Sequence, residues 1–169
     1  MNNKGATLME MIVIIAIIGI MSSVLVMSFN VVYKQKTSSC AESIDSYLDR
    51  IRLETMSKAE GRYMVLYKTD TGTYMASTTD PATFAEDVSR DELVADKNVQ
   101  IEFKLSNSSS YIKVAEGRRF YLTFDRMTGG FGREYISSEY VDCIRISLGG
   151  LQSEKVIRLV TDTGKHYIE

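Results

Sequence analysis

An uncharged apolar run near the amino terminus constrains this chain more than any other feature. The run extends from Met11 to Tyr33 without a charged residue. As a helix it would be roughly 35 Å long, which is enough to cross the hydrocarbon core of a bilayer. The sequence therefore predicts a membrane-spanning helix, and the rest of the chain leaves room for one domain of about 130 residues.

A single carboxylate, Glu10, directly precedes this run. A charge at the edge of a membrane span costs roughly 2–4 kcal/mol unless a cation meets it, and such residues are functional candidates by default. No lysine or arginine lies between Glu10 and Lys34. Two interpretations of Glu10 therefore stay open: a functional carboxylate whose cationic partner lies outside this segment, or an interfacial carboxylate that reaches water at the end of the helix.

The residues before the run differ from an ordinary secretory signal, which has a shorter apolar core followed by its cleavage site. Here the polar leader Met1–Lys4 is followed by Gly5 and Ala6, and the apolar run comes after them. The stretch KGATLME with its apolar helix resembles the class III signal of type IV pilins and type II secretion pseudopilins. The resemblance implies that a prepilin peptidase cuts after Gly5 and methylates the new amino terminus of Ala6. It also implies that the Ala6 ammonium of one subunit pairs with Glu10 of its neighbour on assembly. The family most often has phenylalanine at the position of Ala6.

The segment after the run has an apolar stripe at helical spacing. The predicted helix runs from about Thr7 to Ala59 and ends at Gly61, and its stripe consists of Cys40, Ile44, Tyr47, Leu48, Ile51 and Thr55. After Gly61 the apolar period changes to two, which predicts strands with one buried face over 63–67, 99–105, 120–124 and 144–148. The tetrapeptide TDTG occurs at 69–72 and again at 161–164, and predicts two hairpin turns. The polar stretch 79–98 is interpreted as a connection with one helical turn that starts at Asp80 and Pro81.

Three further stretches resemble the GspH/FimT family of minor pseudopilins and pilins. They are LDRIRLETMSKAEGRYMVLYKTDTGTYMAS (48–77), FDRMTGG (124–130) and VIRLVTDTGKHYIE (156–169). The resemblance implies an α+β pilin fold, in which a long amino-terminal helix packs on a carboxy-terminal antiparallel β-sandwich-like head. The predicted divisions are a prepilin leader (1–5), a transmembrane and assembly half-helix (6–33), an amphipathic half-helix (34–61) and a β-rich globular head (62–169).

The chain carries little that predicts an enzyme, a cofactor or a metal site. Its one histidine, His166, is interpreted as a surface strand residue, and the glycine-rich TGGFG at 128–132 as a flexible turn. The acidic residues Asp87, Asp91, Glu92 and Asp96 lack the spacing of an EF-hand and are interpreted as solvated loop charge. Cys40 and Cys143 lack zinc-site spacing, which leaves either one disulfide or two buried free thiols.

The resemblance predicts a non-enzymatic minor pilin or pseudopilin of a type IV pilus or a type II secretion pseudopilus. Its expected partners are other pilins or pseudopilins, the prepilin peptidase, the assembly platform of the inner (cytoplasmic) membrane, and membrane lipid before assembly. Its expected location is the cytoplasmic membrane as a single-pass protein with an extracytoplasmic head, and then the filament. Two alternatives stay open. One is a membrane-anchored extracellular domain that never polymerises. The other is a FimT-like pilin that binds DNA through Arg118, Arg119, Arg126, Arg133, Arg145, Arg158 and Lys165.

Overall fold

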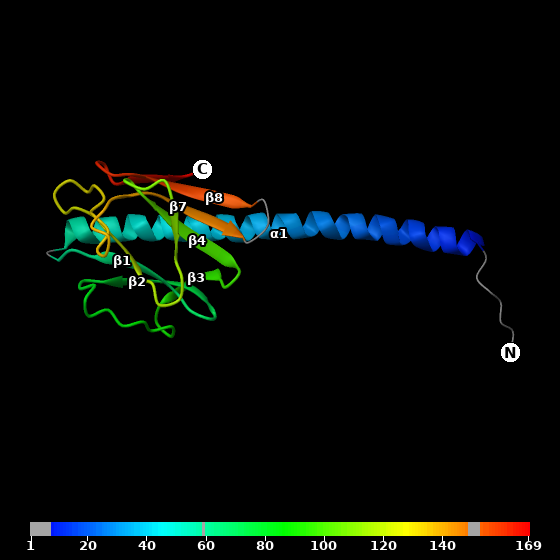
Figure 1. Ribbon diagram of the computed structural model, residues 1–169, viewed down its shortest axis with the longest axis horizontal. Helices are drawn as coiled ribbons and strands as arrows, with labels where there is room; N and C mark the ends of the chain where they lie inside the picture. Colours follow the sequence, from blue (N-terminus) through cyan, green and yellow to red (C-terminus); the bar gives the residue numbers. More distant parts are fainter. Residues whose placement is uncertain (1–7, 59, 149–152) are drawn as a thin grey trace. The chain divides into compact units, whose positions relative to one another are not determined.

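The computed structural model describes residues 8–58, 60–148 and 153–169, with the side chains of 24–30 outside the described part. The chain divides into two compact units, Met1–Gln35 and Lys36–Glu169. Helix α1 (Leu8–Ser57) contributes its first residues to one unit and the rest to the other (Figure 1). The two units are described separately below.

The predicted membrane-spanning helix is contradicted. Among the described residues, no helix combines the length and the apolar character that a membrane crossing needs. The predicted fold class, with its membrane-spanning half-helix on a head, and the predicted location as a single-pass cytoplasmic membrane protein are therefore both wrong.

The second unit contains two antiparallel sheets, and nine strands are described in it. The four-stranded sheet has the order β3-β2-β1-β6, and the five-stranded sheet has the order β5-β4-β7-β8-β9. The strand bounds are β1 (Tyr63–Lys68), β2 (Gly72–Thr78), β3 (Glu92–Asp96), β4 (Val99–Leu105), β5 (Tyr111–Lys113), β6 (Phe120–Thr123), β7 (Val141–Leu148), β8 (Glu154–Val160) and β9 (Lys165–Ile168).

Within this unit, the predicted apolar stripe of α1 is confirmed. All of its side chains are buried, and Ile44, Leu48 and Ile51 have no exposed surface. In the view of Figure 1, β1 and β2 lie on one side of this part of the helix and β7 and β8 on the other. The rings of Phe103 from β4 and Phe120 from β6 stack with their centroids 3.4 Å apart, so the two sheets share one core.

Both predicted hairpins are confirmed. The first TDTG joins β1 to β2, and the second joins β8 to β9. Gly164 in the second turn has a φ of 64°, in the left-handed region that favours glycine. The predicted strand over 99–105 matches β4, while β7 begins three residues before the predicted start at Ile144.

The polar stretch 79–98 differs from its prediction as a connection with one helical turn. Its last part forms strand β3, which pairs with β2. The earlier part covers the face of the four-stranded sheet where Val65, Tyr67 and Tyr121 cluster, with Phe84 packed against them. The Tyr67 hydroxyl donates a 2.6 Å hydrogen bond to Asp91, so this stretch is tied to the sheet by polar contacts as well.

Candidate functional site

The most unusual surface of the described chain is the first part of α1, in the first unit. Large apolar side chains occupy nearly every position there, and each has about half or more of its surface exposed. Leu8 is 79% exposed and Ile15 is 67% exposed. The others are Met9, Met11, Ile12, Val13, Ile14, Ile17, Ile18, Ile20 and Met21. Since successive helical residues point about 100° apart, this surface, which we call the apolar helix surface, extends all round the helix.

Glu10 lies in the first turn of α1, within this surface, and its residue is exposed. A carboxylate there interacts favourably with the partial positive charge at the helix amino terminus. Gly5 and Ala6, the predicted cleavage and methylation residues, lie outside the described residues. The structure therefore places Glu10 on the helix and gives no geometry for the predicted Ala6–Glu10 pair.

The polar side chains that follow do not interrupt the apolar helix surface. The Ser22 hydroxyl donates to the Ile18 carbonyl and the Ser23 hydroxyl donates to the Ile20 carbonyl, each at 2.7 Å. A Cβ built at Gly19 would meet no atom within 4 Å, so the described chain itself does not require glycine there. These hydroxyls can be covered by another chain at little cost, because their hydrogen bonds are already made.

The two cysteines are free thiols, so the disulfide alternative is not what the structure shows. Cys40 lies on α1 and Cys143 on β7, and both are buried. Burial raises the pKa of the Cys40 thiol to about 12. The Cys143 thiol faces the Tyr111 hydroxyl at 3.8 Å. Both residues therefore belong to the packing of the second unit.

Several of the basic residues that could bind DNA already have carboxylate partners in the second unit. Arg119 pairs with Glu86 at 2.8 Å, and Arg158 pairs with Glu169 at 3.1 Å. Arg145 pairs with Glu102, a buried residue, and its guanidinium also lies over the ring of Tyr111. These carboxylates offset part of the positive charge that phosphate contacts would use.

The acidic residues of 87–96 also have structural contacts. Asp91 accepts hydrogen bonds from the Tyr67 hydroxyl and from the Asp87 backbone, and Asp96 pairs with Lys36 at 2.5 Å. Within the described residues, no three histidine, cysteine or acidic side chains are grouped so that they could hold a metal ion.

The prediction that His166 is a surface residue is wrong. Its side chain is only 4% exposed, because this residue of β9 packs against Asp45 of α1. Nε2 lies 3.1 Å from the Asp45 carbonyl oxygen, and Nδ1 lies 3.2 Å from the Gly164 carbonyl oxygen. The Asp49 carboxylate is 3.5 Å from Nε2. The imidazole thus connects the last strand to the helix, a role that depends on tertiary contacts and had no local signal.

The Asp45 carboxyl beside His166 predicts a pH-dependent stability. Its Oδ1 atom is buried and has no hydrogen-bond partner in the described part of the chain. Burial raises the pKa of Asp45, while His166 lowers it and Asp49 raises it by smaller amounts. A raised carboxyl pKa means that folding favours the protonated form, so this contribution to stability is lost as the pH rises through the pKa.

We therefore expect Asp45→Asn to raise the melting temperature at neutral pH and to leave it nearly unchanged at low pH. The shift should be small, about 1–2 °C, because part of the side chain remains in solvent. Thermal unfolding followed by circular dichroism at both pH values measures it, with the exposed Glu116→Gln as a charge control. A loss of stability at neutral pH would show that the ion pair with His166 outweighs the burial of the carboxylate.

The sequence did not predict that Arg52 of α1 joins two turns of the second unit. Its Nε donates to the Gly129 carbonyl at 3.0 Å and its Nη2 donates to the Thr163 carbonyl at 2.8 Å. One side chain on α1 therefore fixes the glycine turn of TGGFG and the second TDTG turn. The arginine lies in the stretch that resembles the GspH/FimT family, but its partners are two backbone carbonyls that no sequence pattern identifies.

Comparison of the chain with known proteins found no matching family model, no matching curated protein and no matching solved structure.

Proposed function

We propose that the chain is a non-enzymatic structural subunit of the pilin and pseudopilin class, which assembles with other subunits through the first part of α1. The observation that carries this proposal is the apolar helix surface. A helix that is apolar on every side is normally buried in its working state, and exposed apolar areas of this size mark interaction sites. The leader and the stretch KGATLME support the same class.

The size of the surface indicates that more than one neighbour covers it. Complete burial of a large apolar side chain contributes about 1.5–3 kcal/mol, so eleven half-exposed ones could contribute on the order of 10 kcal/mol. Association of two chains costs an estimated 4–15 kcal/mol. A single neighbour can cover only one side of the helix, which leaves association marginal. A bundle in which several helices surround each other covers every side, as in a filament.

In the proposed assembly, Glu10 sets the register between subunits. Cleavage after Gly5 creates an ammonium at Ala6, and a neighbour's Glu10 can neutralise it among apolar side chains. The ammonium and the carboxylate can both be buried only as a pair, because removing either partner leaves the other charge buried without compensation. The pair therefore contributes more to the choice of register than to the free energy of assembly.

The processing step gives the first test of the proposed function. We expect the protein purified from cells that contain their prepilin peptidase to lack Met1–Gly5 and to carry one additional methyl group. In cells without the peptidase it should keep its full length. Intact-mass spectrometry of the purified protein measures both. A full-length, unmethylated chain in both strains would refute the proposed assembly pathway.

A further inference from the structure

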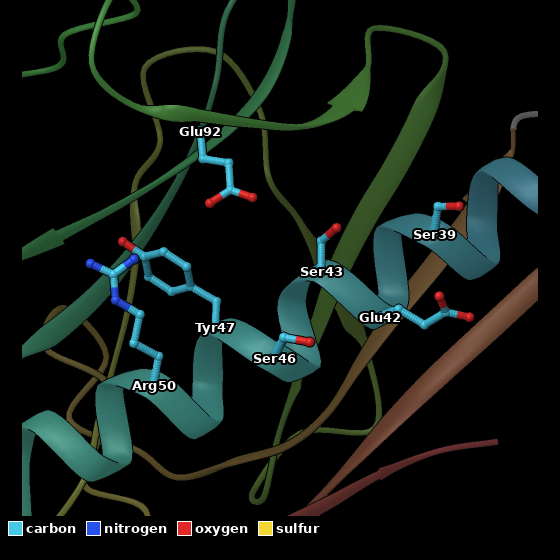
Figure 2. Close-up of a pocket in the computed structure, with 7 residues that line it drawn as sticks. All are labelled: Ser39, Glu42, Ser43, Ser46, Tyr47, Arg50 and Glu92. Atoms are coloured by element: carbon cyan, nitrogen blue, oxygen red, sulfur yellow. The ribbon is translucent and has the colours of Figure 1, made fainter.

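The second unit has an unpaired strand edge beside a polar groove. Strand β3 is the last strand of the four-stranded sheet, and β2 is its neighbour on one side only among the described strands. The groove beside it, of about 430 Å³, lies between α1 and β3. It is lined by Ser39, Glu42, Ser43, Ser46, Tyr47, Arg50 and Glu92 (Figure 2).

The length of the groove suits a short extended segment. Along α1, the step from Ser39 to Arg50 is about 16 Å at 1.5 Å per residue. The five residues of β3 span a similar length, about 17 Å at 3.3 Å per residue. The ion pair between Lys36 and Asp96, at 2.5 Å, joins the helix to the far end of β3. An added strand of about five residues would therefore match β3 in length and lie along the helix side of the groove, with Glu92 as the β3 residue that lines it.

The side chains of the helix wall leave room for such a segment. Ser39, Ser43 and Ser46 follow one another at helical spacing, and their side chains are short. Figure 2 shows the Ser43 side chain and the Tyr47 ring directed toward β3, with the Glu92 carboxylate reaching from β3 toward the helix. Polar hydroxyl groups therefore face an edge whose backbone groups can pair with a further strand.

The groove has an unpaired negative charge on the side of β3, the carboxylate of Glu92. Arg50 is paired with Glu54 at 3.2 Å, and its guanidinium lies over the Tyr47 ring. No lysine or arginine nitrogen in the described part of the chain lies within 4 Å of the Glu92 carboxylate. Glu42, at the rim, accepts only from the neighbouring Ser38 hydroxyl among the described contacts. The unpaired charge of this groove is therefore negative.

We propose that the edge of β3 binds an extended segment of a partner protein as an added strand, and that a lysine or arginine of that segment pairs with Glu92. Charge decides this choice of occupant. An acidic segment would meet the carboxylate of Glu92, and a second copy of β3 would bring a second Glu92, so both are repelled. The inference goes beyond the proposed assembly through the apolar helix surface, and it uses residues of the second unit only.

The same carboxylates could instead serve only to protect the edge against pairing, since charged residues commonly guard edge strands. The two roles differ in what they expect for a basic segment. A purely protective edge binds no strand of either sign, whereas a binding edge accepts a basic one. The test below separates the two roles.

The test uses the full chain in a non-ionic detergent and a fluorescein-labelled short peptide in which lysine alternates with threonine. Fluorescence anisotropy is expected to show binding in the micromolar range, because a few edge hydrogen bonds and one ion pair give only modest affinity. A matched peptide with glutamate in place of lysine should not bind. A lysine peptide with alternate backbone nitrogens methylated should bind at least about tenfold more weakly, since it cannot donate to the strand edge.

Two substitutions locate the binding. Glu92→Gln should weaken it about tenfold, and Ser43→Lys should abolish it by placing an ammonium within the groove. Glu116→Gln, which removes an exposed carboxylate outside the groove, should leave it unchanged. Circular dichroism confirms that each variant is folded. Absence of binding, binding that Glu92→Gln leaves intact, or equal binding of the methylated peptide would each overturn the proposal.

Discussion

Replacing Glu10 by glutamine is expected to remove the subunit from filaments while leaving the second unit folded. In the proposed assembly, the substitution leaves the Ala6 ammonium of the neighbouring subunit buried without its partner. Breaking one side of a buried ion pair costs about 3–5 kcal/mol, which corresponds to a loss of at least about a hundredfold in incorporation. The variant keeps the helix, because glutamine is as good a helix former as glutamate.

The measurement compares the amount of the protein in filaments sheared from cells with its total amount in the same cells, by immunoblotting. Glu116→Gln removes an exposed carboxylate of the second unit and should assemble normally. The melting temperature of the second unit should be the same in both variants. Normal incorporation of Glu10→Gln into filaments would refute the role of Glu10 in register, even if the processing at Gly5 were established.

Elements governed by local rules could be predicted from the sequence. The buried stripe of α1 follows from helical spacing, and the two TDTG turns follow from the preferences of aspartate and glycine in tight turns. Strand β4 alternates apolar and polar residues along its whole length, which fixed both of its ends. In each case, the sequence pattern and the element that it predicts lie within the same few residues.

Strand β3 was missed because its pattern is weak. Its residues are Glu92, Leu93, Val94, Ala95 and Asp96, and only Ala95 is buried. An edge strand with charged ends lacks the alternation of a half-buried strand, so its pairing with β2 determines it. The proposed groove depends on that pairing and was therefore also invisible in the sequence.

The apolar run shows where composition misleads. Its residues predict a membrane crossing by length alone, but the described apolar part of α1 does not meet the requirements of one. The structure shows that the apolar side chains of the first part of α1 are exposed on every side of the helix. In the proposed assembly, neighbouring subunits cover these side chains, and the predicted pairing of Glu10 concerns the same part of the helix.

Substituting alanine for Gly164 is expected to destabilise the second unit strongly. Gly164 has a φ of 64°, where an L-residue costs roughly 1–2 kcal/mol. A Cβ there would also overlap the Gly129 carbonyl oxygen and lie 3.1 Å from Nε of Arg52. The turns could separate only by breaking the hydrogen bond from Arg52 to Gly129, so we expect a total loss of about 3 kcal/mol or more.

The matched control is Gly117→Ala. Gly117 has a similar φ of 75°, but a Cβ there would meet no atom within 4 Å, so the substitution carries the backbone cost without the overlap. In thermal unfolding, Gly164→Ala should lower the melting temperature by roughly 6–12 °C and Gly117→Ala by roughly 2–5 °C. Equal shifts would mean that the two turns can move apart freely, and that Arg52 does not hold them together. A larger shift for Gly164→Ala than for Gly117→Ala shows that the close approach of the two turns makes glycine necessary there, in addition to the left-handed backbone geometry.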